Sequence, residues 1–451
     1  MTRWLLLLLA VLGCTRFGPV YPSRPAARPS PLVADPLPSR INAHVSLSAA
    51  GLRSSLEEAV PKAGDGTFAL LGGDRPYKWT RSPLDVSFAS GRIVVETDVT
   101  ANIELPISSM DVVFNVKIAA EPIINTAYAL KVQSTEVVVH SDDRRLKLAD
   151  QVAGVFELVG GQIDQKLRAF AYDLKPLLEE TYARVQKPLP LPMDSASACA
   201  ELRVLGIEAA PLILADGIEK DFSLIVAPSI TIPCTAQHRA PEPLPPLANV
   251  AMVPTGPFTV TVPVAASYAE LTRALGAAFT QGKLFFSAEH PKLYLEKPEV
   301  YEAAGSLVLR LHIAGPVHKF GIDTEIDGDL YLVGRPTLID NEIALPDLEP
   351  TIETSNFLLS LKALKDGDRI KLEARKALRL DLSERLRSVR EKLSSELTFG
   401  TPKDCFVGHV DKLELTDLHA HESYLRLNVV LTARASASSP CSQLLPQAPS
   451  R

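Results

Sequence analysis

The sequence predicts an α+β protein with two tandem, similar domains. Each domain is expected to be a long curved antiparallel sheet wrapped around one long helix plus a short helix. Three observations predict this class: short segments in which apolar and polar residues alternate, one long amphipathic segment in each half, and a matched cysteine pair in each half. The chain has 451 residues, of which 46% are hydrophobic and 22% are charged. This composition is typical of globular chains and excludes long disorder for most of the sequence.

The N-terminus reads MTRWLLLLLAVLGC, a positive charge at Arg3 followed by an apolar run. As a helix, this run would span about 14 Å, which is too short for the apolar core of a bilayer, about 30 Å thick. We therefore expect a secretion signal in residues 1–14. Its end resembles a bacterial lipobox, which predicts lipidation of Cys14. The alternative is an ordinary signal peptide with a chance cysteine.

The residues after Cys14 predict where the protein is anchored. Thr15 stands where an aspartate would resemble an inner-membrane retention signal, so we expect an exported, lipid-anchored protein of the outer membrane that faces the periplasm. Residues 15–40 contain seven prolines. Such a segment does not form a helix or a sheet and is expected to be an extended tether.

A second proline-rich stretch, 235–257, divides the rest of the chain into domains 41–234 and 258–441, followed by a tail, 442–451. Four features recur in the same order in both halves, which predicts a tandem duplication. They are an opening strand with a short helix, a proline followed 19 residues later by a serine, a long amphipathic helix, and a cysteine pair.

Most of each half is expected to be antiparallel strands, because apolar residues alternate with polar ones. The expected strands are Leu84–Phe88, Ile93–Ile103, Val112–Ile118, Leu307–Ile313 and Phe320–Ile326, the last ending in a turn at Asp327–Asp329. Apolar residues at helical spacing predict long helices over Ile163–Val185, with a kink at Pro176, and over Leu382–Leu397. We expect the second helix to cover its own sheet; a position on a membrane surface is the alternative.

The chain has five cysteines. Cys199 and Cys234 are 35 residues apart, and Cys405 and Cys441 are 36 apart, so we predict one disulfide in each half and assign Cys14 to the lipid. Four cysteines allow three pairings, and free thiols are a further alternative.

The order and length of these features, with the stretch Gly328–Pro336 (GDLYLVGRP), resemble an uncharacterised bacterial lipoprotein family of about this length. The resemblance covers residues 41–441. The architecture also resembles the tubular lipid-binding superfamily, which includes bactericidal/permeability-increasing protein. That second resemblance implies an apolar tunnel that holds acyl chains.

The sequence contains no motif that indicates an enzyme. We find no Gly-x-Ser-x-Gly elbow, no phosphate-binding glycine loop with lysine and no His-Glu-x-x-His. His419 and His421 would share one face of a strand, but no third ligand follows from the spacing, so we expect no metal and no cofactor. A net charge of −6 without basic runs excludes a typical nucleic-acid binder.

The leading functional hypothesis is a lipid-anchored protein that binds or transfers a phospholipid or another acyl-chain ligand in each half. An envelope scaffold with solid cores and an unspecified protein partner is the alternative, and an envelope hydrolase is a third. The expected ligand-contacting residues are Phe88, Val95, Val99, Phe114, Val116, Leu309, Leu311, Ile322 and Ile326 on the strands, and Leu167, Phe170, Leu386, Val389 and Leu393 on the helices.

Overall fold

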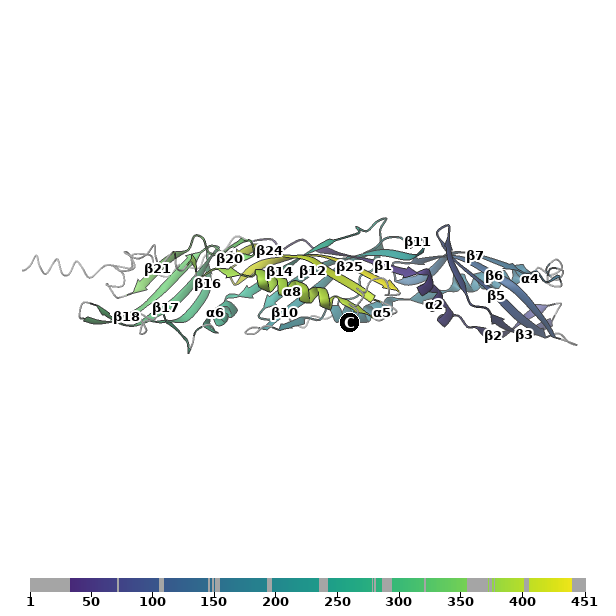
Figure 1. Cartoon of the computed structure of the whole chain (residues 1–451), viewed down its shortest axis with the longest axis horizontal. Coiled ribbons are helices and arrows are strands. Elements are labelled where there is room, and N and C mark those ends of the chain that lie inside the picture. The colour runs from purple at the N-terminus through teal and green to yellow at the C-terminus, as the bar shows by residue number, and fades with distance from the viewer. Residues whose placement is uncertain are drawn as a thin grey trace, which may run out of the picture.

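The structure is a computed structural model and describes residues 33–439, apart from 71–72, 105–108, 145–146, 148–149, 151–154, 193–196, 235–241, 278, 280, 286–293, 320–321, 355–371, 373–374, 377 and 401–404. The molecule is elongated, and its sheets follow one another along the long axis (Figure 1). We call the seven-stranded sheet at one end the first terminal sheet, the ten-stranded sheet in the middle the central sheet, and the five-stranded sheet at the other end the second terminal sheet.

The predicted α+β class is wrong, because strands dominate the described residues. The helices described there are short: α2 (Ala49–Ala59), α4 (Val155–Ala169), α5 (Lys175–Val185), α6 (Tyr268–Ala277) and α8 (Ser383–Glu396). None of them is a long helix wrapped by a sheet of its own half. In this part of the chain, no helix is both long and apolar enough to cross a bilayer.

The first predicted long helix is two helices with a strand between them. The segment Ala171–Asp173 forms β8, which pairs with Ala129–Lys131 of β7 (Ala129–His140). Pro176 lies in the first turn of α5. Proline fits this position, because its missing N–H would have no partner there. The apolar spacing therefore located residues 163–169 and 175–185 as helical, but it missed the strand between them and the start of α4 at Val155, and Pro176 begins a new helix instead of bending an old one.

Each half opens with the predicted strand and short helix. These are β1 (Ser39–Ser48) with α2, and β14 (Phe258–Ser267) with α6. In both, the last strand residue is a serine at the N-terminus of the helix. The Ser48 hydroxyl accepts the N–H of Gly51 at 3.1 Å, and the Ser267 hydroxyl accepts the N–H of Glu270 at 3.3 Å. Such caps satisfy N–H groups that have no partner inside the helix.

The central sheet joins the two halves. Two long inner strands, β12 (Gly217–Ile232) and β25 (Tyr424–Ser439), frame its middle, and β1 and β14 lie end to end between them. β1 is antiparallel to β12 and parallel to β25, whereas β14 is antiparallel to β25 and parallel to β12. Where the two short strands meet, the Ser39 hydroxyl accepts the N–H of Thr261 at 3.0 Å.

We call the parallel pairing of β1 with β25, and of β14 with β12, the seam. The remaining strands of the central sheet extend away from it on both sides: β9 (Leu189–Pro192), β10 (Ser197–Ala209), β11 (Ile213–Leu214), β13 (Leu247–Asn249), β23 (Thr398–Gly400) and β24 (Cys405–Ala420). The two halves thus share one sheet, and neither encloses a helix in a sheet of its own.

Helices α5 and α8 cover one face of the central sheet (Figure 1). Tyr182 of α5 packs on Val204 and Val226, and Leu393 of α8 packs on Val410. Ile41 of β1 contacts both clusters. Because side chains alternate along a strand, Asn42 and His44 project from the opposite face.

The first terminal sheet is formed by β2 (Ala63–Leu70), β3 (Gly73–Arg81), β4 (Asp85–Ala89), β5 (Arg92–Glu104), β6 (Ser109–Ile124), β7 and β8. The strands expected from alternation over 84–118 are present. The turn between β4 and β5 lies at Ser90 and Gly91, and both residues have positive φ. Helix α4 packs against β7.

The second terminal sheet contains β15 (Lys283–Phe285), β16 (Tyr294–Ala303), β17 (Ser306–Lys319), β18 (Ile322–Gly334) and β21 (Glu349–Thr354). The predicted turn at Asp327–Asp329 is wrong, because β18 runs straight through these residues and pairs with β17 along its whole length. A small sheet of β19 (Thr337–Ile339), β20 (Glu342–Ala344) and β22 (Leu380–Asp381) lies apart from it.

A buried arginine makes a second connection between the halves. The side chain of Arg426, on β25, is 4% exposed and donates to the carbonyl of Ala34 and to a carboxylate oxygen of Asp35, both at 3.0 Å. The chain is therefore fixed to the second half immediately before it enters β1. Beside this contact, the His421 ring stacks on Tyr424 with centroids 4.7 Å apart.

The predicted disulfide Cys199–Cys234 is present and ties β10 to the residues that follow β12. Cys405, at the start of β24, is also disulfide-bonded. Its expected partner Cys441 lies outside the described residues, as does Cys14, so the pairing Cys405–Cys441 and the lipidation of Cys14 stay predictions.

Replacing both Cys199 and Cys234 by serine should lower the free energy of unfolding by about 3–4 kcal/mol. The bond closes a loop of 35 residues, and its loss enlarges the conformational freedom of the unfolded chain. Urea denaturation of the oxidised protein and of the double variant measures this difference. An unchanged midpoint and slope would show that the bond contributes nothing to stability.

The stability of the protein should fall as the pH drops below about 6.5, and His421 should contribute to this fall. Burial, helped by the nearby positive charge of Arg426, lowers the pKa of His421. Between its folded and unfolded pKa values the unfolded state binds more protons, so acid favours unfolding. The melting temperature of His421→Phe, which retains a ring beside Tyr424, should depend less on pH than that of the wild type. Ser423→Ala, in the exposed turn nearby, should keep the wild-type slope.

Candidate ligand-binding sites

One face of the first terminal sheet is apolar over most of its width, and we call it the first apolar face. Register places Val95 opposite Val86 and Ile118, and Val99 opposite Phe114, with all side chains on one side. The face consists of Tyr77, Trp79, Val86, Phe88, Ile93, Val95, Val99, Ala101, Val112, Phe114, Val116, Ile118, Val137 and Val139. Five expected ligand-contacting residues, Phe88, Val95, Val99, Phe114 and Val116, thus share this face.

Helix α4 covers one edge of this face. The Thr135 hydroxyl on β7 donates to the carboxylate of Asp164, and Arg168 donates to the same carboxylate at 2.7 Å. The bonds from Arg168 and Thr135 hold the pKa of Asp164 below its usual range, so the carboxylate is charged at neutral pH. This contact fixes α4 along β7, and Phe156 of the same helix packs on the cluster around Ala101 and Val112.

Burial differs strongly between the two ends of the molecule. In the described part of the first apolar face, Val86, Ala101, Val112 and Val116 are fully buried. The other side chains of the face whose burial is described are partly exposed, and Phe156 of α4 packs beside Ala101 and Val112. At the other end, the corresponding face packs against α6 and the loop before β21. There the fully buried side chains include Tyr268, Phe279, Leu295, Leu309, Leu311, Ile313, Leu330, Leu332, Leu345 and Leu348. The second end has a filled core, and the first has a row of partly exposed apolar side chains.

Two glycines of β2 allow aromatic rings to lie on the sheet at the edge of the first apolar face. A Cβ at Gly64 would lie 2.8 Å from Nε1 of Trp79, and a Cβ at Gly66 would lie 2.8 Å from the hydroxyl of Tyr77. Atoms cannot approach so closely. Glycine at these positions therefore holds both rings flat against β2, facing Ala101 and Ile103 of the neighbouring strand.

The other expected ligand-contacting residues do not gather at one site. Leu167 is partly buried on α4, and Phe170 is 46% exposed. Leu309 and Leu311 lie in the filled core, and Ile322 and Ile326 lie on β18, with side chains outside the described set. Leu386, Val389 and Leu393 were expected opposite these strands, but α8 packs on β24 of the central sheet, and Val389 is 47% exposed.

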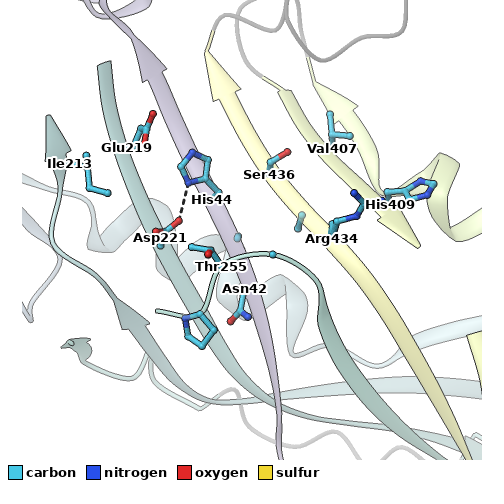
Figure 2. A pocket seen from close by; sticks show the side chains of 14 residues that line it. Asn42, His44, Ile213, Glu219, Asp221, Thr255, Val407, His409, Arg434 and Ser436 are labelled. Atoms are coloured by element: carbon cyan, nitrogen blue, oxygen red, sulfur yellow. Dashed lines mark hydrogen bonds and ion pairs between the residues drawn. The ribbon is translucent and has the colours of Figure 1, made fainter. Parts of the chain in front are cut away.

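A pocket of about 730 Å³ lies at the seam, on the face of the central sheet opposite α5 and α8, and we call it the seam pocket (Figure 2). Strands of both halves form its floor, and the linker residues Pro254–Gly256 and Ile213 of β11 line it as well. The floor residues are Asn42, Ala43, His44, Glu219, Asp221, Val407, His409, Arg434, Ala435 and Ser436. From its prolines, the segment 235–257 was expected only to separate two domains. No sequence motif indicated this pocket.

Two cross-strand rows of side chains cross the floor of the seam pocket. In the first row, His44 lies between Asp221 and Ser436 in register, and its Nδ1 is 2.9 Å from a carboxylate oxygen of Asp221 (Figure 2). In the second row, Arg434 pairs with His409 across β25 and β24. Arg434 donates to both carboxylate oxygens of Asp411, at 2.7 and 3.0 Å, and the bond from Arg434 lowers the pKa of Asp411.

Asp221, His44 and Ser436 lie side by side in the order acid, imidazole and hydroxyl, which is the order of groups in a serine hydrolase. An active serine needs a hydrogen bond to its base, and the described residues show none between Ser436 and His44. The histidines considered as metal ligands do not form a centre either. His419 lies on β24 opposite Arg426, His421 lies in the turn after it, and the described residues contain no group of three metal-binding side chains.

Together, the shared central sheet and the apolar face at one end define an elongated β protein with a surface suited to a hydrophobic ligand. The chain belongs to the family described as a domain of unknown function, DUF4403, whose pattern matches residues 37–438. The expected resemblance to an uncharacterised family over nearly the whole chain is thus confirmed.

Solved structures of similar proteins add only distant likenesses. The crystal structure of lipopolysaccharide binding protein has 12% identity and a TM-score of 0.28, covering 89% of this chain and 99% of its own. The structure of P47 of Clostridium botulinum E1 has 7% identity and a TM-score of 0.22, covering 88% and 100%. No curated protein matches the sequence.

Gly64→Val should displace the Trp79 ring from β2, because the new side chain would occupy the position of the indole. We expect a loss of about 1–3 kcal/mol in the free energy of unfolding and a red-shifted tryptophan emission. Because the sequence contains two tryptophans, the measurement is made in a Trp4→Phe background. Asp65→Val, on the exposed side of the same strand, is the control and should leave the emission unchanged.

Proposed function

We propose that this protein binds an acyl-chain ligand, such as a fatty acid or a phospholipid tail, on the first apolar face beside α4. The observation that carries the proposal is the contrast in burial between the two ends. The first end presents partly exposed valines, isoleucines and a phenylalanine over three adjacent strands, whereas the matching face at the second end lies beneath α6 in a filled core.

Desolvation supplies the binding free energy in this proposal. Each methylene group removed from water contributes about 0.8 kcal/mol, and the apolar side chains lose water at the same time. The row Val95, Val99, Phe114 and Ile118 offers no charged group to an acyl chain. The polar headgroup of a lipid would remain at the rim of the sheet, outside this row.

The sequence led us to expect one ligand in each half, whereas we now propose a single site, on the first terminal sheet. Among the described residues of the second end, the corresponding face is buried in a filled core, and we propose that this end is a rigid support. We further propose that the protein is not an enzyme and that Cys14 anchors it to the periplasmic face of the outer membrane. A short lipobox-like segment and a proline-rich tether support the anchor, and residues 1–32 lie outside the described set.

Trp79 offers a direct test, because it borders the first apolar face. In the Trp4→Phe background, a fatty acid brominated along its chain should quench the Trp79 emission in a saturable way, since bromine quenches only at close range. Val99→Asp should abolish saturable quenching, because it places a charge in the middle of the face opposite Phe114. Val113→Asp, on the opposite side of β6 and 51% exposed, is the matched control and should behave like the parent protein.

Circular dichroism and the melting temperature show whether each variant is folded. Should Val99→Asp fail to fold, Val99→Asn introduces a polar group without the charge and serves the same purpose. Equal quenching in Val99→Asp and Val113→Asp, or no saturable quenching in the parent, would contradict the proposal.

A further inference from the structure

The floor of the seam pocket contains a polar atom that has no partner in the described part of the chain. Asn42 is 9% exposed and lines the pocket, yet its Oδ1 accepts no hydrogen bond. Ser223, opposite Asn42 on β12, is fully buried and does not line the pocket, so Asn42 is the group that faces a ligand there. A buried polar group without a hydrogen bond costs about 1–3 kcal/mol of stability, so a polar molecule that bonds to Asn42 in the pocket would be stabilising.

The charged groups of the pocket are largely paired with one another. His44 is bonded to Asp221, and Arg434 is bonded through two nitrogens to Asp411. Glu219 adds a further carboxylate. The carboxylates of Asp221, Asp411 and Glu219 outnumber the guanidinium of Arg434, which disfavours an anion. A cation would find Asp221 and Asp411 already bonded to His44 and Arg434, so we expect an uncharged ligand.

The pocket also offers hydroxyl groups at its rim. Thr255 in the linker is exposed, and Ser436 on β25 is partly exposed, and both line the hollow (Figure 2). Hydroxyl, carboxamide and imidazole groups supply donors and acceptors together. A ligand hydroxyl is itself both a donor and an acceptor, so it matches this mixture better than a group with only one role. A volume of about 730 Å³ lies within the ordinary range for small-molecule sites.

We propose that the seam pocket binds a neutral ligand that carries several hydroxyl groups, a sugar or a sugar-like polyol, with Asn42 bonded to it at the floor and Thr255 at the rim. The ligand would contact strands of both halves and the linker, so its binding would also strengthen the seam. This site is separate from the first apolar face, and its occupation does not depend on acyl-chain binding.

Saturation-transfer NMR on the full chain tests the proposal with four probes: maltose, methyl glucoside, octyl glucoside and inorganic phosphate. At least one sugar should receive saturation from the protein, and phosphate should not compete with it. Equal affinity for methyl and octyl glucoside would indicate a free sugar as the natural ligand. Tighter binding of octyl glucoside that persists in Val99→Asp, which blocks the first apolar face, would indicate the sugar headgroup of a lipid.

Three variants assign the signal to the pocket. Asn42→Leu, which keeps the size but removes the amide, should weaken sugar binding at least tenfold, a change equal to about 1.4 kcal/mol. Thr255→Val changes an exposed linker residue with little risk to folding and should also weaken binding. Asn102→Leu, on β5 of the first terminal sheet, is the control and should bind like the wild type. The proposal is overturned if no sugar binds, if phosphate displaces the sugar, or if Asn42→Leu and Thr255→Val both bind as the wild type does.

Discussion

The pairing of strands across the seam is the interaction on which the rest of the structure depends. β1 and β14 occupy one position between β12 and β25, so each half completes its hydrogen bonding only with a strand of the other. Backbone N–H and C=O groups must find partners when they are buried, and the seam supplies them. The contact of Arg426 with Ala34 and Asp35 adds a side-chain connection between β25 and the residues that precede β1. This shared sheet carries the terminal sheets at its two ends and creates a pocket to which both halves contribute.

The amino-acid pattern predicts local structure well and the choice of neighbours poorly. Alternation of apolar residues located the strands of 84–118 and placed Val95, Val99 and Phe114 on one face, because side-chain direction has period two in any strand. Cysteine spacing gave the Cys199–Cys234 bond. Periodicity does not say which strand lies beside which, so β1 and β14 were assigned to separate sheets although they meet in one. For the same reason α8 was expected over the second terminal sheet, whereas its apolar residues cover β24.

The two candidate sites differ in how far the sequence could predict them. Five of the residues of the first apolar face were expected from alternation alone, but which of them are covered depends on where α4 lies, and its Asp164 bonds to Thr135, 29 residues away in the chain. The seam pocket could not be predicted, because Asn42, Asp221 and Arg434 come from distant segments and become neighbours only through strand register. The two sites suit different kinds of ligand. The polar floor of the seam pocket would bind its ligand through hydrogen bonds, and the first apolar face would bind its ligand through desolvation.

Native mass spectrometry of the protein without residues 1–14, purified without detergent, tests the central claim most directly, because no lipid on Cys14 can then add acyl mass and any bound ligand from the cell is detected. If the first apolar face holds an acyl chain, the spectrum will contain a species heavier than the polypeptide by the mass of one fatty acid or phospholipid. Organic extraction will release a molecule of that mass, and the heavier species will be absent from Val99→Asp. A spectrum of the bare polypeptide alone, before and after incubation with phospholipid vesicles, would contradict the account.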